Sequence, residues 1–511
     1  MRVRLVLVAS ALVVVGAAGA APTWRATAEL SPSQRAIGPE LAVNPAGDAI
    51  VVWNREEGAV CPSEPAALEC IHIVETTARA RTATGWQAPA EVARPGVGNR
   101  PRVAIDTTGR TALLWVHDIG EDRVVQATIR SGLSGAWPNA NDLSGSPLEV
   151  RNHAIALDGQ GNAVAVWAQR DVSTFYVVGD LRVAARGFWE APVALSSLSG
   201  NAPAGPALAL APGGEAVVAW IEGGQVRAAR GLTTAGTWES PVTLASAGGP
   251  VATDVDVAVS AAGDAVVVWS WGANSVQAAA RAAGGGWSGP VTLGTGRAID
   301  VGIDGAGTAV AVWLGGPARN VLQSSRHRRG AARWSRPFAV AQGASEPTLA
   351  MNAAGNAVAA WTRGASRVIR TALRPAALGT WVRPTDVSGS GASAPRVGLS
   401  AASDATVVWN RARPPRVVVE VRHLTGGGPL LVHQKIPKTA LVGRAATFAV
   451  APAAWTAPLS GSMTWRFGDG TSATGVRVTH AYRSAGTYTL TVTQRDAAGA
   501  VSTLTRRVSV S

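Results

Sequence analysis

The sequence predicts an all-β fold made of eight similar units, and three observations lead to this expectation. The first is a repeated segment, such as Gly47 to Trp53, in which a turn residue stands six positions before a tryptophan. Its eight tryptophans are Trp53, Trp115, Trp167, Trp220, Trp269, Trp313, Trp361 and Trp409. The second is another tryptophan series that alternates with the first. Its members are Trp24, Trp86, Trp137, Trp189, Trp238, Trp287, Trp334 and Trp381. The third is the composition, with 47% hydrophobic and 15% charged residues, 58 glycines and 30 prolines, which excludes a disordered chain and a long coiled coil.

Each unit contains four short apolar segments separated by turn signals, which is typical of four strands. In the fourth unit these segments are Pro206 to Ala211, Glu215 to Trp220, Gln225 to Arg230 and Thr237 to Leu244. Both tryptophan series repeat about every 51 residues. Four strands in each of eight units predict an eight-bladed β-propeller, with a solenoid as the alternative. The last unit lacks its fourth strand, so we expect Thr23 to Leu30 to complete it and close the ring.

The N-terminus has the pattern of a secretory signal peptide. Arg2 and Arg4 precede the apolar run Leu5 to Gly16, and Ala18 to Ala20 resembles a cleavage site. We expect a mature chain that starts near Ala21 and is secreted, or associated with the cell surface; an uncleaved signal anchor is the alternative. The later apolar runs are too short to cross a membrane, so no transmembrane segment is expected after signal removal.

Two cysteines, Cys61 and Cys70, lie close together in a proline-containing segment. Disulfides persist in the oxidising compartments that exported proteins reach, so we predict that these cysteines pair. A metal site needs more cysteine or histidine nearby, and only His72 is close. We therefore predict no metal site and no cofactor.

The net charge of +13 comes almost entirely from arginine, since Lys435 and Lys438 are the two lysines. A basic surface attracts anionic polymers, so an acidic polymer is a candidate partner; we expect no specific nucleic acid. An arginine ends the predicted third strand of each unit, and we expect it to pack on the following tryptophan as a cation–π pair. The alternative is a ring of arginines that holds an anionic polymer. These residues are Arg79, Arg130, Arg186, Arg230, Arg281, Arg326, Arg374 and Arg422.

The uniform placement of both tryptophan series indicates packing rather than ligand binding. A binding site occupies one place, whereas a packing solution repeats in every unit. We therefore expect all sixteen repeated tryptophans to be buried between units.

The repeats resemble bacterial β-propellers of the sialidase-like and WD-repeat-like kinds. The segment Asp304 to Thr308 approaches the Asp-box of sialidases, although its tryptophan follows later. The resemblance implies a shared architecture.

The repeats end at a glycine-rich segment, Gly426 to Gly428, which predicts a flexible linker. The alternating segments beyond it are typical of a small β-sandwich. Trp465 to Thr471, followed by His480 to Tyr482 and Ala485 to Val492, closely resembles the PKD domain, an immunoglobulin-like module. The resemblance implies an extracellular spacer or a module that contacts proteins or carbohydrates, with Asp469 serving its turn. The predicted domains are a signal peptide at 1–20, a propeller at 21–424, a linker at 425–432 and a sandwich at 433–511.

Longer loops distinguish the first three units from the others. The interval from a tryptophan of the first series to the next of the second is 33 residues in the first unit, 22 in the next two and 18 to 21 in later ones. Loops on a rigid scaffold often carry function, so we expect a ligand site there. The candidates are a histidine, carboxylate acceptors and an aromatic platform: His117, Asp118, Glu121, Asp122, Asp171, Phe175 and Tyr176.

Two function classes remain after these observations. The first is an exported, non-enzymatic binding or scaffold protein that contacts a polysaccharide or a cell-surface protein. The sequence favours it because no nucleophile elbow, phosphate loop or paired zinc ligands appear. The second is a glycan-active hydrolase or lyase that uses carboxylates of the same loops, since a hydrolase needs two carboxyl groups about 5 to 9.5 Å apart.

Overall fold

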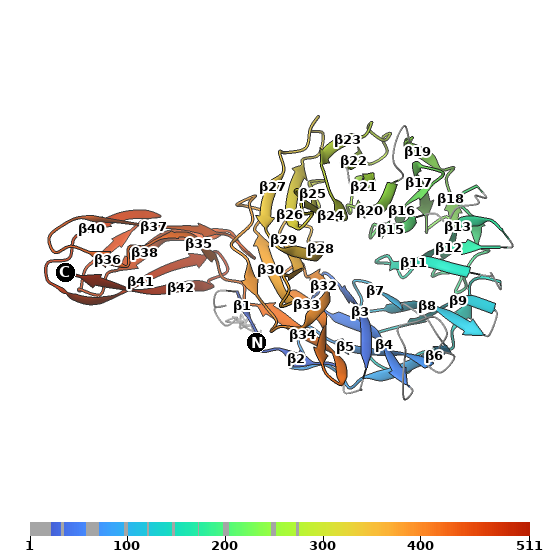
Figure 1. Ribbon diagram of the computed structural model, residues 1–511, viewed down its shortest axis with the longest axis horizontal. Helices are drawn as coiled ribbons and strands as arrows, with labels where there is room; N and C mark the ends of the chain where they lie inside the picture. Colours follow the sequence, from blue (N-terminus) through green and yellow to red (C-terminus); the bar gives the residue numbers. More distant parts are fainter. Residues whose placement is uncertain are drawn as a thin grey trace, which may run out of the picture. The chain divides into compact units, whose positions relative to one another are not determined.

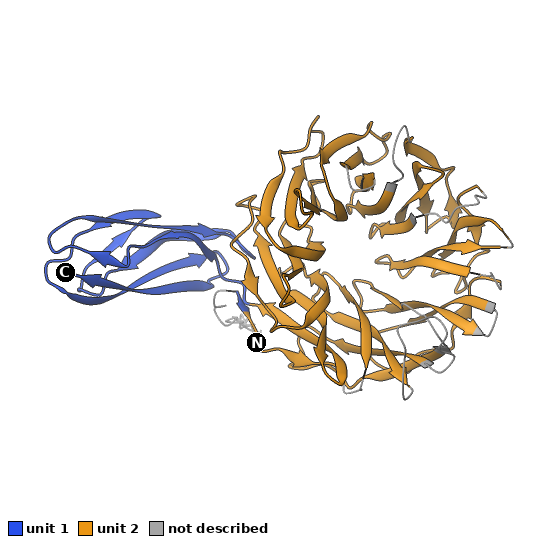
Figure 2. Cartoon of the chain, in the orientation of Figure 1, with its two compact units in different colours: residues 1–23, 426–511 blue, residues 24–425 orange. Residues whose placement is uncertain are grey.

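The computed structural model describes residues 22–31, 35–57, 71–96, 101–119, 122–145, 149–171, 173–197, 204–246, 252–271 and 275–511. Every regular element in these residues is a β-strand, so they form an all-β structure without a helix that could cross a membrane (Figure 1). The predicted signal peptide at 1–20 and the predicted disulfide between Cys61 and Cys70 lie outside the described residues. The chain divides into two compact units, Trp24–Thr425 and Gly426–Ser511, with the residues up to Thr23 grouped with the second (Figure 2). Each unit is described by itself.

The described residues of the larger unit form eight sheets around a common centre, with the first strand of each sheet innermost (Figure 1). Sheet 1 contains β3 (Ala36–Val43), β4 (Ala49–Glu57), β5 (Ile71–Arg79) and β6 (Ala90–Gly96). Sheet 2 contains β7 (Arg102–Ile105), β8 (Thr111–Ile119), β9 (Asp122–Arg130) and β10 (Asn141–Asp142). Sheet 3 contains β11 (Glu149–Leu157), β12 (Ala163–Arg170), β13 (Phe175–Arg182) and β14 (Val193–Ala194). Sheet 4 contains β15 (Ala204–Leu210), β16 (Glu215–Glu222), β17 (Gln225–Leu232), β18 (Thr237–Trp238) and β19 (Val242–Ala245).

The later sheets repeat this order. Sheet 5 contains β20 (Ala252–Val259), β21 (Ala265–Trp271), β22 (Ser275–Arg281) and β23 (Val291–Gly294). Sheet 6 contains β24 (Arg297–Ile303), β25 (Ala309–Gly315), β26 (Val321–His327) and β27 (Phe338–Ala341). Sheet 7 contains β28 (Ala344–Met351), β29 (Ala357–Arg363), β30 (Val368–Arg374) and β31 (Thr385–Asp386). Sheet 8 contains β32 (Ala392–Leu399), β33 (Ala405–Arg413) and β34 (Arg416–Thr425), with β1 (Thr23–Trp24) and β2 (Ala28–Glu29) paired to β34.

The hairpin between strands one and two is fixed by a polar residue nine positions before the strand-two tryptophan. In sheet 6, Asp304 Oδ1 accepts the backbone N–H groups of Ala306 at 2.9 Å and Thr308 at 2.7 Å, so the Asp-box-like segment is this hairpin. Gly307 between them has a φ of 77°, which favours glycine. Six other sheets use the same side-chain bond, through Asn44, Asp106, Asp158, Ser260, Asn352 and Ser400.

The core lies between neighbouring sheets. The eight strand-two tryptophans are 0 to 2% exposed, as expected for this series. Trp269 of sheet 5, for example, packs against Val217, Ala219 and Ile221 of sheet 4. Each strand two is therefore buried on both faces, which explains its continuous Ala and Val runs.

The fourth strand is interrupted rather than continuous. The segment Thr237 to Leu244 was expected to form one strand, but the structure divides it into β18 and β19, which both pair with β17. Pro241 lies between the two pieces and has no N–H to donate, so the ladder breaks there. Sheet 8 has the same division, between β1 and β2.

The smaller unit is a two-sheet sandwich. One sheet contains β35 (Leu430–Lys435), β37 (Ala446–Ala453) and β40 (Arg477–His480). The other contains β36 (Thr439–Ala440), β42 (Val501–Val510), β41 (Gly486–Asp496), β38 (Leu459–Arg466) and β39 (Ser472–Thr474). Phe448, Trp465, Phe467 and Tyr482 fill its core. The segment between β34 and β35 is 426–429, which is shorter than the expected linker at 425–432.

Asp469 serves the turn of the sandwich, as expected. Its Oδ1 accepts the Thr471 N–H at 3.0 Å and the Thr471 hydroxyl at 2.6 Å, and its Oδ2 lies 2.8 Å from His480 Nε2. Partial burial acts to raise the pKa of Asp469, but the bonds from Thr471 and His480 outweigh burial and lower it. Asp469 thus links the turn to a core-facing histidine.

Candidate functional site

Pockets open between neighbouring sheets at three junctions of the larger unit. We call them the 4–5, 5–6 and 8–1 pockets after the sheets that form them; their volumes are about 370, 250 and 870 Å³. Each is lined by strands three and four of the earlier sheet and by a second-series tryptophan of the later sheet. We call this residue the strand-four tryptophan, although in these three sheets it stands just before the fourth strand. These tryptophans are Trp287, Trp334 and Trp86.

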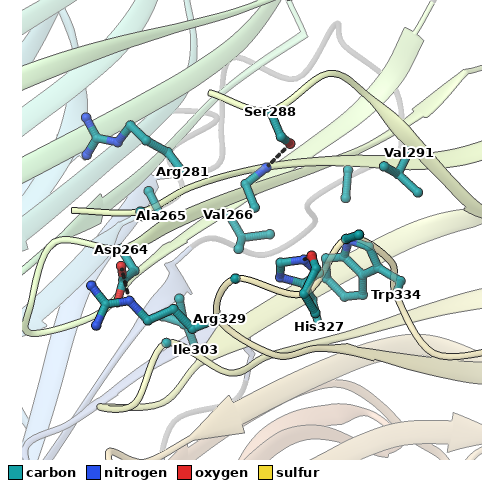
Figure 3. Close-up of a pocket in the computed structure, with 17 residues that line it drawn as sticks. Asp264, Ala265, Val266, Arg281, Ser288, Val291, Ile303, His327, Arg329 and Trp334 are labelled. Carbon is teal, nitrogen blue, oxygen red and sulfur yellow. Dashed lines mark hydrogen bonds and ion pairs between the residues drawn. The ribbon is translucent and has the colours of Figure 1, made fainter. Parts of the chain in front are cut away.

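The 5–6 pocket places an aromatic pair beside an ion pair (Figure 3). The His327 and Trp334 rings lie 5.3 Å apart between centroids, and Nε2 of His327 lies 2.8 Å from a backbone carbonyl oxygen. Arg329 Nε contacts Asp264 Oδ1 at 3.1 Å, while Ser288 Oγ accepts a backbone N–H at 3.0 Å. The apolar lining residues include Val266, Ala278, Ala280, Val291 and Ile303.

The 4–5 pocket holds a more extensive charged network beside its tryptophan. Arg230 contacts Glu239 at 2.6 Å and Glu215 at 3.1 Å. Arg281 also binds Glu215, and its guanidinium carbon lies 5.5 Å from the Trp287 ring centroid. Every charge in this network has an opposite charge as its partner.

The 8–1 pocket is the largest of the three. The Trp86 ring stacks on His423, with centroids 5.5 Å apart and planes inclined by 22°. Arg25, Arg79 and Gln87 contribute polar groups to its lining. It lies where β1 and β2 complete sheet 8, so residues from both ends of the unit form it.

The strand-four tryptophans differ from the expectation that they are buried. Trp381 is 8% exposed, but the other seven are only half-buried. The expectation was wrong for these because they stand at the outer edge of each sheet, where the neighbouring sheet covers the ring only in part. The regular placement of this series therefore does not indicate packing alone. It also places a partly exposed indole beside polar groups in several sheets.

The predicted site residues of sheet 2 belong to a regular hairpin. His117 and Asp118 end β8, and Asp122 begins β9, while Glu121 lies outside the described residues. His117 Nδ1 lies 3.0 Å from Gln126 Oε1, and Asp118 Oδ2 lies 3.5 Å from Arg123 Nε. Both side chains are therefore engaged by their own sheet.

The predicted aromatic platform of sheet 3 is not formed. Phe175 is 8% exposed and lies near two arginines, with Arg151 at 5.5 Å and Arg170 at 5.6 Å from its ring centroid. Tyr176, as the next residue in β13, points to the other face. Its hydroxyl donates to Asp171 Oδ2 at 2.8 Å. Adjacent strand residues cannot share one platform, which explains the difference.

The predicted arginine–tryptophan pairs occur in part. Among the described residues, Arg130 packs on Trp137 at 4.1 Å and Arg281 packs on Trp287. Arg186 is instead ion-paired with Glu190, because β13 ends earlier, at Arg182. The eight arginines therefore do not form one uniform ring of pairs.

Charged residues on the innermost strands, which we call the inner charges, were not among the predicted site residues. The residue thirteen positions before each strand-two tryptophan lies on the innermost strand, directly opposite the residue that precedes that tryptophan. Glu40 occupies this position in sheet 1 and binds Arg396 of sheet 8 at 2.8 Å and Arg102 of sheet 2. Burial acts to raise the pKa of Glu40, but the two arginines outweigh burial and lower it.

Two carboxyl groups occupy the same position in sheets 5 and 6. Asp256 and Asp300 are hydrogen-bonded to each other, and each also accepts a backbone N–H from the next sheet, of Val301 and Leu349 respectively, at 2.8 Å. Burial raises the pKa of both, that of Asp256 to about 6, and the charge of Asp256 raises the pKa of Asp300 further. These carboxyls join inner strands of adjacent sheets.

The described residues contain no cluster of three or more histidine, cysteine, aspartate or glutamate side chains that could hold a metal ion. The arrangement at the junctions offers instead stacking surfaces and directional hydrogen bonds.

Comparison with known families concerns the smaller unit. Residues 435–510 match the PKD domain, so the C-terminal unit is a PKD domain, a module typical of extracellular proteins. A search of curated protein sequences found no match.

Comparison with solved structures gives distant matches. A fungal alcohol oxidase in complex with copper is 11% identical, with a TM-score of 0.46 and coverage of 96% of this chain and 99% of that chain. A leech intramolecular trans-sialidase is 12% identical, with a TM-score of 0.37 and 66% of each chain covered. A fucose-specific lectin from Aleuria aurantia is 12% identical, with a TM-score of 0.35 and coverage of 60% of this chain and 97% of that chain.

Proposed function

We propose that the larger unit is a non-catalytic, eight-bladed propeller that binds glycans in the pockets between neighbouring blades. The observation that carries the proposal is the recurrence of one arrangement at three junctions. In each pocket a half-buried indole stands beside arginine and other hydrogen-bonding side chains.

This combination suits sugars for two physical reasons. The apolar face of a pyranose packs on an indole, which gives a large contact area at low entropic cost. Arginine and carboxylate forks, such as Arg230 with Glu239, present paired donors and acceptors to adjacent hydroxyl groups. The volumes of the 4–5 and 8–1 pockets, about 370 and 870 Å³, lie within the range of ordinary small-ligand sites, and that of the 5–6 pocket, about 250 Å³, lies just below it.

Several pockets on one chain also fit a polymeric ligand. Each site alone binds weakly, but linked sugars that occupy two pockets raise the apparent affinity by a factor of about 10² to 10⁴. The proposal therefore names a polysaccharide or a glycosylated cell-surface protein as the partner.

The proposal includes export. The signal-like residues 1–20 would direct the chain out of the cell, and the PKD domain is typical of extracellular proteins. The propeller would then bind its glycan outside the cell or at the cell surface.

The test is a glycan panel with the purified chain, followed by calorimetry on each sugar that binds. We expect Trp287→Ala and Trp334→Ala each to remove a class of sites, which lowers the stoichiometry. Trp137→Ala is the matched control, because Trp137 has the same place in sheet 2 but lines none of the three pockets. Binding that is unchanged in both pocket variants contradicts the proposal, and release of sugar products would instead establish an enzyme.

A further inference from the structure

The 8–1 pocket differs from the 4–5 pocket at equivalent positions of the repeat. The residue after the strand-four tryptophan of the earlier sheet lines both pockets, as Glu239 in the 4–5 pocket and as Arg25 in the 8–1 pocket. In sheet 4, Arg230 pairs across the strands with Val217, which stands three positions before the buried tryptophan. His423 has the equivalent position in sheet 8, where it pairs with Thr406. The ion pair of the 4–5 pocket is thus replaced by an arginine and a histidine.

His423 is held in its neutral form. Trp86 Nε1 donates to His423 Nε2 at 3.1 Å, so this nitrogen carries no proton, and Nδ1 then donates to Thr406 Oγ1 at 3.0 Å. Burial lowers the pKa of His423 to about 4, and the charge of Arg79 contributes to the shift. His423 is therefore an uncharged support for Trp86 at neutral pH.

Arg79 lacks the carboxylate that its equivalent in sheet 5 possesses. The two arginines are equivalent because Arg79 pairs with Ala49 and Arg281 pairs with Ala265, and each alanine stands four positions before the buried tryptophan of its sheet. Arg281 binds Glu215, but Asp404, the equivalent of Glu215 in sheet 8, is ion-paired with Arg81 at 3.1 Å. The described residues form no ion pair or side-chain hydrogen bond with the Arg79 guanidinium, and the charge of Asp404 acts on it only without direct contact.

Arg25 is also free of an ion pair among the described residues. Its Nε donates to the Thr425 hydroxyl at 2.7 Å. The acidic residue in the pocket lining is Glu29, which already contacts Arg413 at 3.0 Å and Arg416 at 3.7 Å. Two guanidinium groups consequently line a pocket of about 870 Å³, and no carboxylate of the described residues forms an ion pair with either of them.

We propose that the 8–1 pocket binds a sugar that carries a carboxylate, with Arg25 and Arg79 contacting the carboxylate and Trp86 stacking on the ring. The inference rests on the proposed glycan-binding function and assigns this pocket a separate ligand class. A guanidinium presents a planar pair of donors that matches a carboxylate, and such charged bonds are about twice as strong as neutral ones. The 4–5 and 5–6 pockets, whose arginines are already ion-paired, would take neutral sugars.

The test compares acidic sugars with their methyl esters, which keep the ring and remove the charge. The panel contains oligosaccharides of galacturonic, glucuronic and sialic acid, measured by calorimetry with the full chain in about 0.15 M salt, which screens distant charges. We expect at least one acid to bind about tenfold or more tightly than its ester, as the loss of a charged contact predicts. Equal binding of every acid and ester, or no binding of any acid, overturns the inference.

Variants locate the site. Arg25→Gln and Arg79→Gln should each weaken binding of the acid by about tenfold and leave binding of the ester unchanged. Arg25 is exposed, so this variant keeps the fold even if Arg79→Gln does not. Arg383→Gln is the control, since it removes one exposed positive charge outside the pocket. An equal loss in the control would show that only net charge matters, which also overturns the inference.

The outcomes separate this inference from the proposed function. Sulfated neutral sugars test whether any anion suffices; binding of these as tight as that of the carboxylate sugars contradicts the carboxylate assignment. If binding of neutral sugars is unchanged in Trp287→Ala and Trp334→Ala, the general glycan proposal is contradicted. Acid binding that depends on Arg25 would still stand in that case.

Discussion

The two tryptophan series occupy equivalent places in every sheet, yet they serve different purposes. The strand-two indoles are 0 to 2% exposed and pack between sheets, whereas most strand-four indoles are half-buried and three of them line pockets. Six of the eight strand-two indoles also donate to a polar side chain, as in the bond of 2.9 Å from Trp53 Nε1 to Glu75 Oε2. The difference teaches that in a repeat protein a regular position can be structural in one strand and available to ligands in another.

The largest expected effect separates the two series within one sheet. Trp269→Ala should lower the free energy of unfolding by about 3 to 5 kcal/mol, because it leaves a cavity between sheets 4 and 5. Trp287→Ala should cost about 1 kcal/mol, since it mainly loses a partly exposed contact with Arg281. Urea unfolding monitored by circular dichroism measures both. Similar losses in the two variants would contradict the division into a packing series and a pocket series.

A second prediction concerns differences within the buried series. Trp409 Nε1 donates to Glu420 Oε2 at 2.9 Å, while Trp361 Nε1 is buried without a hydrogen-bond partner in the described structure. Trp409→Phe should therefore cost about 1 to 2 kcal/mol more than Trp361→Phe, because it leaves a buried carboxylate with one donor fewer. The difference between the two unfolding free energies is the readout. A larger loss in the Trp361 variant would show that its indole N–H is satisfied in solution.

A third prediction concerns Asp180 on β13, the third strand of sheet 3. Asp180 is 1% exposed and has the position in sheet 3 that Thr77 and Thr128 have in sheets 1 and 2. Those two hydroxyls donate to the carbonyl oxygens of Gln87 and Pro138 at 2.6 and 2.9 Å. Burial raises the pKa of Asp180 to about 7; the Leu181 N–H opposes the shift, and the charge of Glu190 adds to it. The folded state then holds its proton more tightly than the unfolded state, so stability falls as pH rises from about 4 to 7.

Asp180→Thr should remove this penalty. We expect no more than a small gain at pH 4 and a gain of about 1 to 2 kcal/mol at pH 8, where the wild-type carboxyl must be buried in charged form. Unfolding curves at the two pH values provide the measurement. A gain that does not depend on pH would mean that Asp180 titrates normally.

The smallest effect involves Ala298 on the inner strand β24, a residue that lines none of the three pockets. Ala298 has a φ of 51°, a conformation that glycine adopts more easily. Ala298→Gly should raise the unfolding free energy by about 0.5 kcal/mol, since the relief of strain exceeds the added freedom of the unfolded chain. Ala309→Gly, at a residue of β25 without a positive φ, should instead destabilise. Destabilisation in both variants would contradict the strain at Ala298.

Most of the larger unit's strand pattern could be predicted from the sequence, because glycine turns and apolar runs are local signals. In the fourth unit the expected strands two and three begin at Glu215 and Gln225, as β16 and β17 do. The division of strand four also has a local cause, because Pro241 stands inside the segment that was expected to be one strand. The PKD domain was recognised from paired motifs that are specific to it.

The candidate site was less predictable because exposure depends on the neighbouring sheet. The position of Trp86 is evident in the sequence, but its contact with His423, more than 300 residues away, is not. The inner charges carried a signal that could have been found. Glu40, Asp256 and Asp300 each stand thirteen positions before a repeated tryptophan, in strands that are otherwise largely apolar. Their partners, however, follow only from the order of the sheets around the centre.

The pairing of β1 and β2 with β34 has a consequence for how the chain acquires its shape. The contact between Arg25 and Thr425 spans 400 positions of the chain, so sheet 8 can form only after nearly the entire unit has been synthesised. Contacts of such high contact order form slowly, and the other seven sheets can assemble first from near neighbours. The 8–1 pocket then appears last. Its ligand would bind only to molecules whose ring is complete, and would hold the two ends together once they have met.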